Sequence, residues 1–446
     1  MKFGGTSVAD PAAISRLMDV VRQQRVRGGT PVVVVSALAG VTDKLVAVAR
    51  LAEDGDGEKA AAEIRALLDR HVSVASAVAN ASRDAVVGEV SQEFAELAGL
   101  VHALAVLREV SPRSLDAVLA VGEIASSRIV AAAMNDHQLA SEWVDARRVL
   151  ITDTEHNVAA PDLPRTAEIA AELVRPALAA GRVAVLGGFI GATPAGVTTT
   201  LGRGGSDYSA AVFGACLNVD EIQIWTDVDG MLTADPRIVP QPRVVPQLSF
   251  AEASELAYFG AKVLHPSTIL PAVAKNIPVR ILNSRRPESP GTLITADGAS
   301  TNGQLTAIAC KRDVTVIDIT SSRMLMAHGF LRRLFEVFER LKTPVDVVTT
   351  SEVSVSVTVD DTRRLDAIVD NLRNFAEVNC EPEMAIVCVV GENLRADASI
   401  FGRAVTALER IPLRLVSQAA SRRNVTFVLR DSDVPHAMMR LHEAFF

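Results

Sequence analysis

A glycine turn between two apolar segments constrains the fold more than any other feature of this sequence. The turn reads Gly202-Arg203-Gly204-Gly205, and a helical pattern of apolar residues follows it over residues 208–217. Ser206 and Asp207 suit the N-cap of this expected helix. A short apolar strand pattern at 221–225 comes next and ends in polar residues. This succession predicts an α/β fold in which a ligand lies where the strands end.

The same turn has the chemistry of an anion site. Glycines let the backbone approach an anion closely, and the unpaired N–H groups at the start of a helix need an acceptor. Arg203 adds a planar cation that can hold a carboxylate or a phosphate through two hydrogen bonds. The alternative is a strand-to-helix turn that uses its glycines for backbone reasons alone.

Composition indicates a globular chain throughout. The 446 residues are 49% hydrophobic and 22% charged, which suits about three domains with large cores. The net charge is −8, and no long basic stretch is present, so we expect no nucleic-acid partner. The most apolar run, residues 31–35, is far too short to span a bilayer, so we expect no membrane association.

The cysteines indicate a reducing compartment. Four cysteines are spread along the chain in apolar surroundings and include no CxxC pair: Cys216, Cys310, Cys380 and Cys388. This pattern favours buried, reduced thiols in a cytoplasmic protein and gives no sign of a structural zinc site.

Six motifs are in the order found in one known family. They are KFGGTS at 2–7, SALAGVTD at 36–43, GE at 122–123, TTTLGRGGSD at 198–207, TDVDG at 226–230 and FGAKVLHP at 259–266. With these motifs the chain resembles the amino-acid kinase superfamily and, within it, the aspartokinases. The resemblance implies a catalytic domain over residues 1–298, with a parallel-rich sheet, helices on both faces and a helical insertion at about 43–135.

The resemblance also implies the reaction and its site. It implies phosphorylation of the side-chain carboxylate of L-aspartate by ATP, with Mg²⁺ carried by the nucleotide, as the first step of lysine, threonine and methionine biosynthesis. The residues that match catalytic positions are Lys2, Asp207 and Lys262. Those that match substrate contacts are Ser36, Thr42, Glu123, Phe189, Arg203 and Ser206. Those that match nucleotide contacts are Lys2, Gly4, Gly5, Thr226, Asp227, Leu232, Arg237, Lys262 and Val263.

Glu123 also stands out on physical grounds. It falls on the apolar side of a predicted helix, where a carboxylate is costly unless a cation meets it. The ammonium group of an amino acid would be such a cation, whereas a solvated helical glutamate is the alternative. The substrate's own side-chain carboxylate is ionised at neutral pH, so its attack on ATP needs no general base.

The C-terminal part predicts a second kind of domain. Residues 312–382 alternate as β-α-β-β-α-β, which is a ferredoxin-like order. A second copy at 383–446 ends one strand short, and a spare strand lies at 306–311. We therefore expect residues 303–311 and 383–446 to form one unit, into which the first is inserted. The arrangement resembles the paired ACT domains of aspartokinases.

ACT pairs sense amino acids and join subunits, so the resemblance implies feedback inhibition and a homodimer formed through these domains. The residues that match the effector pocket of the lysine-inhibited group are Met324, Gly329, Phe330, Leu331, Val345, Asp346, Ser351 and Glu352. L-lysine is the expected effector, and L-threonine stays open.

Two rival functions also stay open. One is a kinase for another amino acid, and the other is a catalytically inactive amino-acid sensor that keeps the fold. The sequence has no GxxxxGK[ST], HRD or DFG motif, which excludes the P-loop and protein-kinase routes by motif.

Overall fold

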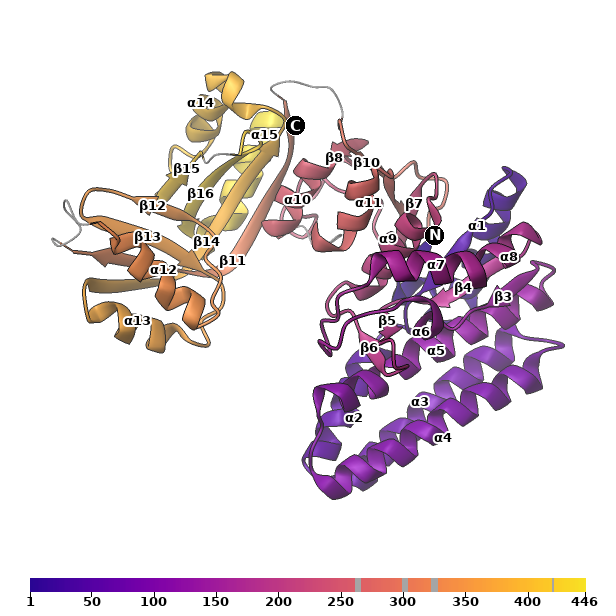
Figure 1. Ribbon diagram of the computed structural model, residues 1–446. Helices are drawn as coiled ribbons and strands as arrows, with labels where there is room; N and C mark the ends of the chain where they lie inside the picture. Colours follow the sequence, from indigo (N-terminus) through magenta and orange to yellow (C-terminus); the bar gives the residue numbers. More distant parts are fainter. Residues whose placement is uncertain (261–265, 299–303, 322–327, 419–420) are drawn as a thin grey trace. The chain divides into compact units, whose positions relative to one another are not determined.

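The computed structural model describes residues 1–260, 266–298, 304–321, 328–418 and 421–446, which form two compact units (Figure 1). The first unit contains Met1–Met231 and Val263–Gly298, and the second contains Leu232–Lys262 and Ala299–Phe446. By its contacts, the segment from 232 to 262 belongs to the second unit, although the sequence analysis placed it in the catalytic domain. The predicted boundary at residue 298 stays a prediction.

The first unit is built on a mostly parallel sheet in the order β3-β4-β2-β1-β7-β9-β10. Only β10 runs antiparallel to its neighbour. The strands are apolar and largely buried, which suits a sheet covered on both faces. Their bounds are β1 Lys2–Phe3, β2 Val32–Val35, β3 Ser141–Trp143, β4 Val183–Gly187, β7 Ile222–Thr226, β9 Val279–Asn283 and β10 Thr292–Thr295.

A separate antiparallel pair precedes the glycine turn. It consists of β5 (Ile190–Ala192) and β6 (Thr198–Thr200), which lie in register with Gly191 opposite Thr199. The pair holds the two ends of the loop that leads from the central sheet to Gly202.

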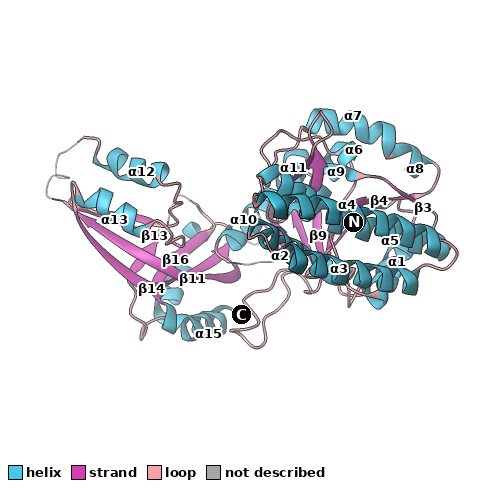
Figure 2. Cartoon of the chain, turned by 90° about the horizontal axis from the view of Figure 1, so that it is seen from below, coloured by secondary structure: helices cyan, strands magenta, loops and turns pink. Residues whose placement is uncertain are grey.

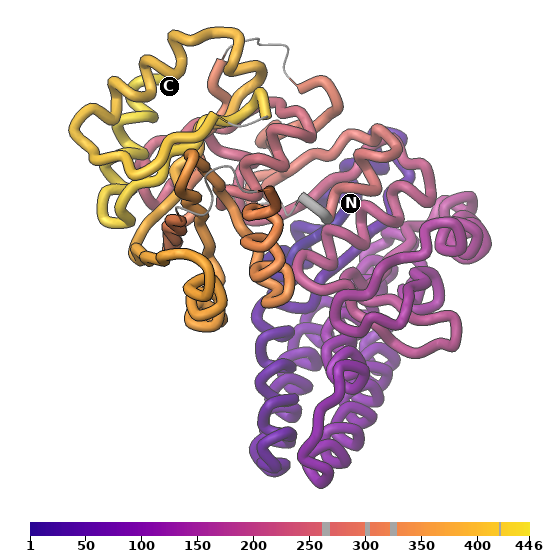
Figure 3. Tube along the Cα trace, turned by 60° about the vertical axis from the view of Figure 1, so that its left-hand side comes forward, coloured from indigo at the N-terminus to yellow at the C-terminus, as the bar shows by residue number. Residues whose placement is uncertain are grey.

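Helices surround this sheet, and four of them form the predicted insertion. These four, α2 to α5, run alongside one another and share one apolar core with α1 (Figure 3). Asp10 caps α1 by accepting a 2.8 Å hydrogen bond from the N–H of Ala13, as its position before Pro11 predicts. The helices are α1 Pro11–Val26, α2 Val41–Glu53, α3 Gly57–Val78, α4 Arg83–Leu107, α5 Pro112–Asp136, α6 Ala146–Val149, α7 Leu163–Leu173, α8 Arg175–Ala179, α9 Gly205–Leu217 and α11 Leu270–Lys275.

Two helices of the insertion are long and apolar enough to cross a membrane by length and composition. In α5, 83% of the most apolar window is buried inside the protein, and in α4 the share is 33%. A core helix passes the same test, and most of the buried apolar residues of both helices belong to the core just described.

The helix after the glycine turn begins earlier than predicted. It starts at Gly205, and its N-cap is Gly204 in a left-handed conformation with φ of 72°. The expected caps Ser206 and Asp207 therefore lie inside the first turn, and that prediction was wrong. Glycine takes the cap because its φ is positive, a conformation that costs glycine little.

The second unit contains one six-stranded antiparallel sheet in the order β12-β13-β11-β14-β16-β15. Two of its strands, β11 and β14, are long and run through both ferredoxin-like halves (Figure 2). Ala307–Lys311 pairs with Ile386–Val390, so the strand that the last half lacks in sequence comes from upstream of the first half. The strands of this sheet are β11 Leu305–Thr320, β12 Val348–Thr350, β13 Ser354–Val359, β14 Glu377–Gly391, β15 Leu415–Ser417 and β16 Asn424–Arg430. The short strand β8 (Gln247–Ser249) belongs to the same unit but not to this sheet.

Each half of this sheet has its own core. The helices α12 (Phe330–Arg340) and α13 (Leu365–Arg373) pack on the first half. The helices α14 (Ala398–Ala407) and α15 (Val434–Phe445) pack on the second half. The remaining helix, α10 (Phe250–Tyr258), opens with the predicted capping box between Ser249 and Glu252.

Candidate active site

A cavity of about 600 Å³ opens where β1, β2 and β4 end and where α2 and α9 begin. This is the edge at which parallel α/β sheets bind ligands. The cavity brings together nine of the predicted site residues, which come from five separate stretches of sequence. They are Lys2, Gly5, Ser36, Thr42, Glu123, Phe189, Arg203, Ser206 and Asp207.

Glu123 contributes a buried carboxylate to this cavity. It is 3% exposed, and its Oε2 atom has no hydrogen-bond partner among the residues that the structure describes. Burial raises its pKa to about 8, although a hydrogen bond from the backbone of Ala37 acts in the opposite direction. A cation entering the cavity would relieve this desolvation and return the carboxylate to its ionised form.

Arg203 contributes the opposite charge. It is exposed at the tip of the glycine turn and lines the cavity, and within the described part of the chain it makes no ion pair or hydrogen bond. Gly204, Gly205 and Ser206 line the same wall at the start of α9. A free guanidinium beside a helix N-terminus is suited to a carboxylate.

Lys2 and Asp207, which both line the cavity, form an ion pair. Nζ of Lys2 lies 2.7 Å from Oδ1 of Asp207, and the residue Lys2 is only 8% exposed. Lys2 belongs to β1 and Asp207 to the first turn of α9. The pair holds the ammonium group at the cavity instead of in solvent.

Phe189 is held in a strained position beside the turn. Its φ is 66°, which is uncommon for a bulky residue. Its N–H donates to the hydroxyl of Ser209 at 2.9 Å, and its carbonyl accepts from the N–H of Leu201 at 3.0 Å. A Cβ on Gly205 would lie 2.6 Å from the ring of Phe189, so only glycine fits there.

Of the predicted nucleotide residues that the structure describes, Lys2 and Gly5 line this cavity and the others lie outside its lining. Gly4 donates its N–H to the carbonyl of Trp225 at 3.1 Å, which places it beside the end of β7, where Thr226 and Asp227 follow. Leu232 and Arg237 belong to the second unit, and Arg237 pairs with Asp235 at 2.5 Å. Lys262 and Val263, which the resemblance predicts as nucleotide contacts, lie outside the described residues.

Comparison with known proteins decides the family. The amino acid kinase family model matches residues 1–283, and an ACT domain model matches residues 387–445. The lysine-sensitive aspartokinase 3 of Escherichia coli is 35% identical over all of this chain and 98% of its own length. The chain belongs to the aspartokinases.

Further aspartokinases agree in sequence and in structure. The chloroplastic aspartokinase 3 of Arabidopsis thaliana is 36% identical over all of this chain and 81% of its own length. The crystal structure of E. coli aspartokinase III in complex with aspartate and ADP matches all of this chain and 99% of that one, with a TM-score of 0.86 and 34% identity. The form of that enzyme in complex with lysine and aspartate matches with a TM-score of 0.81 and 33% identity.

The predicted effector residues of this aspartokinase lie around the start of α12 and the strands beside it. Gly329 caps α12 with φ of 85°, and Leu331 is exposed, but the ring of Phe330 packs in the core against Phe375. Val345 packs against the same core. Met324 lies outside the described residues.

The acidic members of this set differ in their surroundings. Glu352 is exposed beside Ser351, whose hydroxyl bonds that of Ser354 at 2.7 Å. The side chain of Asp346 is 2% exposed. Its Oδ1 atom accepts hydrogen bonds from Nζ of Lys311 at 2.7 Å and from the hydroxyl of Tyr258 at 2.9 Å. Its Oδ2 atom has no hydrogen-bond partner in the described ranges.

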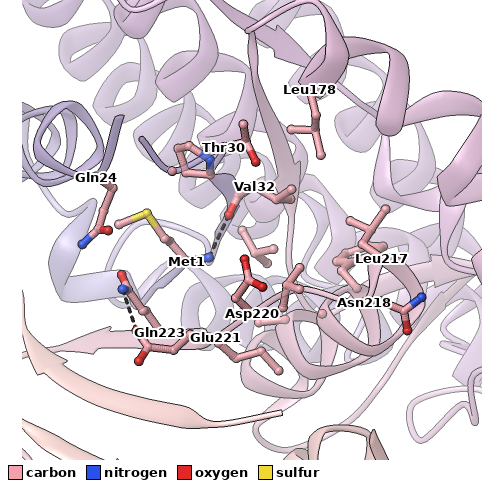
Figure 4. Close-up of a pocket in the computed structure, with 18 of the residues that line it drawn as sticks. Met1, Gln24, Thr30, Val32, Leu178, Leu217, Asn218, Asp220, Glu221 and Gln223 are labelled. Atoms are coloured by element: carbon pink, nitrogen blue, oxygen red, sulfur yellow. Dashed lines mark hydrogen bonds between the residues drawn. The ribbon is translucent and has the colours of Figure 1, made fainter. Parts of the chain in front are cut away.

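A second cavity of about 360 Å³ lies at the opposite edge of the first unit's sheet, where strands begin (Figure 4). It contains none of the predicted site residues. The ammonium group of Met1 donates to the carbonyl of Val32 at 2.8 Å there, and burial lowers its pKa to about 5. The functional groups therefore gather at the carboxyl edge, as the strand order requires.

Several residues that line the active-site cavity are not among the predicted site residues, and four of them lie outside the segment 36–43 and the glycine turn. Leu115 and Leu119 come from α5, Asn157 from a loop and Thr200 from β6. The two leucines precede Glu123 by four and eight residues, so helical spacing gave a signal for them. Asn157 lies in a segment without periodicity, and nothing in its local sequence indicates its place.

Proposed function

We propose that the cavity binds L-aspartate and presents its side-chain carboxylate to ATP. The observation that carries this proposal is the presence in one cavity of the buried Glu123 carboxylate, whose Oε2 atom has no partner among the described residues, and of the exposed Arg203 guanidinium, which makes no ion pair with them. An α-amino acid supplies an ammonium and a carboxylate that match them. Glu123 would hold the ammonium, Arg203 the α-carboxylate, and Ser36, Thr42, Phe189 and Ser206 the rest of the substrate.

The reaction is the transfer of the γ-phosphate of ATP to the side-chain carboxylate of aspartate, which yields 4-phospho-L-aspartate. The attacking carboxylate is already ionised at neutral pH, so the protein needs no general base. Catalysis is then a matter of position and of charge neutralisation. Lys2, which pairs with Asp207, would meet the negative charge that spreads over the phosphate oxygens. Lys262 is proposed as a second cation for the phosphates.

ATP brings the Mg²⁺ in this proposal. Magnesium keeps several water ligands and is commonly held by phosphates with one or two carboxylates. In the described part of the chain no three His, Cys, Asp or Glu residues gather into a metal site. Asp207 at the cavity and Asp227 after β7 are the carboxylates that fit such a shared role. Mg²⁺ held in this way would supply positive charge that offsets part of the charge of the phosphates.

The proposal also covers the feedback ligand, the oligomeric state and the cellular location. L-lysine is the proposed feedback ligand of the ACT half that contains Asp346 and Glu352, because lysine accompanies the similar E. coli enzyme in one of its structures. We propose a homodimer formed through the ACT domains. The four free cysteines and the absence of a basic stretch in the sequence support a cytoplasmic enzyme of amino-acid biosynthesis that binds neither nucleic acid nor membrane.

The test is ATP-dependent turnover with hydroxylamine present to trap the acyl phosphate. Hydroxamate should form with L-aspartate and not with L-glutamate, and L-lysine should suppress it more strongly than L-threonine. Equal rates with glutamate would point to a kinase for another amino acid. No hydroxamate from a protein that still binds lysine would contradict the enzyme and favour a sensor.

A further inference from the structure

A second carboxylate of α5, that of Asp116, lies just outside the cavity lining. Asp116 is 0% exposed, and three residues from two other segments form hydrogen bonds with its carboxylate. His156 Nδ1 lies 2.6 Å from Oδ2, Asn157 Nδ2 donates to Oδ1 at 2.6 Å, and the hydroxyl of Thr200 donates to Oδ1 at 2.5 Å. The backbone N–H of Asn157 lies 3.2 Å from both oxygens.

A carboxylate in such a place is expensive unless donors surround it. The surrounding groups satisfy both oxygens of Asp116, and hydrogen bonds to a charged acceptor are stronger than those between neutral groups. The carboxylate therefore fixes its partners firmly. The site is a built junction between α5, the loop at 153–161 and β6.

The partners of Asp116 form one wall of the active-site cavity. Asn157 and Thr200 both line it. Asn157 is itself held with φ of 69°, and a Cβ on Gly202 would lie 3.0 Å from its carbonyl oxygen. The loop therefore packs directly against the turn, one residue before Arg203.

The same helix also contributes Glu123 to the cavity lining. Asp116 and Glu123 are seven residues apart on α5, which is close to two helical turns, so they face the same side. We propose that Asp116 is a positioning residue that fixes Arg203 relative to Glu123 through Asn157 and Thr200, and so sets the affinity for the amino-acid substrate. This inference rests on the substrate roles proposed above for Glu123 and Arg203.

The test compares Asp116→Asn with the wild-type enzyme in the hydroxamate assay. The amide keeps the size of the side chain but turns one oxygen into a donor that faces other donors. The KM for aspartate should rise by about tenfold or more, because small displacements of binding groups are costly, while the KM for ATP changes by less than about twofold. Direct binding of aspartate should weaken by the same factor.

Asp136→Asn is the matched control. Asp136 lies at the far end of the same helix and likewise receives donors from a loop, the N–H groups of Asn80 and Ser82 and the hydroxyl of Ser82. It does not line the cavity, so its variant should keep the wild-type KM for aspartate.

A second variant protects the test against simple misfolding. Thr200→Val removes one donor to Asp116 while keeping the shape of the side chain, and it should raise the KM for aspartate in the same direction. Combined with Asp116→Asn, it should add less than its separate effect, because both changes break one junction. A lower kcat with unchanged KM values in both variants would show a purely structural carboxylate and overturn the inference. Wild-type turnover in the same assay tests the proposed function separately.

Discussion

At the scale of single residues, Glu123 makes the most direct prediction about pH. Its pKa is raised by burial from an ordinary value of 4.5 to about 8. Between these values the folded protein holds a proton that the unfolded chain has lost. The free energy of unfolding contributed by Glu123 is therefore fully present below the lower value and falls by about 1.4 kcal/mol per pH unit as the pH rises through this range.

Glu123→Gln removes this titration. Thermal unfolding without substrate, measured at both ends of the range, should show the variant gaining stability relative to wild type as the pH rises. Glu63→Gln, at an exposed carboxylate of the same insertion, is the control and should follow the wild type. Parallel curves for Glu123→Gln and wild type would contradict a carboxylate kept neutral by burial.

Single residues also show how far sequence reasoning reaches. Glu123 could be singled out because a charge interrupts an apolar helical face, and Arg203 because glycines flank it. Asp116 lies on the same helix and reads as an ordinary polar residue, since its partners are 40 and 84 residues away. Contacts of that range leave no trace in local spacing, so only the structure reveals the junction.

At the scale of elements, the close approach of β4 and α9 predicts a strict need for glycine. Gly188 follows β4, and a Cβ there would lie 2.8 Å from the Cβ of Ser206. Gly188→Ala should therefore push the start of α9 away from the sheet and displace the turn that carries Arg203. We expect kcat/KM for aspartate to fall by about a hundredfold.

Gly88→Ala is the matched control for this substitution. Gly88 lies within α4, where an added Cβ meets nothing within 4 Å. Alanine there should stabilise the helix by up to about 1 kcal/mol and leave kcat/KM unchanged. Wild-type kcat/KM in Gly188→Ala would show that the start of α9 tolerates displacement.

The bounds of two strands could not be predicted from the apolar pattern. The sequence predicted the order of strands in the second unit, but it read the two long strands as separate pieces. Asp313 and Glu383 interrupt the apolar alternation at the middle of β11 and β14, each with a φ near 60°. Local irregularities of this kind look like turns in sequence. Pairing with the neighbouring strands continues on both sides of these positions, so β11 and β14 are each one long strand.

At the scale of the whole molecule, the segment 232–262 packs with a unit that its position in the sequence does not indicate. The segment that carries α10 lies in sequence between two motifs of the catalytic domain, yet it packs with the ACT strands. The side chains of Thr306 and Asn424 donate hydrogen bonds to Glu252 and Glu255, respectively. The hydroxyl of Tyr258 donates a hydrogen bond to Asp346. Asp346 is therefore hydrogen-bonded to the last residue of α10, which directly precedes the sequence motif at 259–266. Sequence motifs alone could not show this, because they record order and not contact.

The measurement that tests the central claim most directly is turnover by Lys2→Met, with Lys59→Met as control. Lys59 forms an exposed ion pair with Asp56 on the helical insertion. If the cavity at the carboxyl edge is where phosphate is transferred, Lys2→Met should lose at least about a hundredfold in kcat and still bind aspartate, because Lys2 acts on the phosphate. Lys59→Met should keep the wild-type rate. A wild-type rate in Lys2→Met would place the phosphate transfer elsewhere and contradict the account.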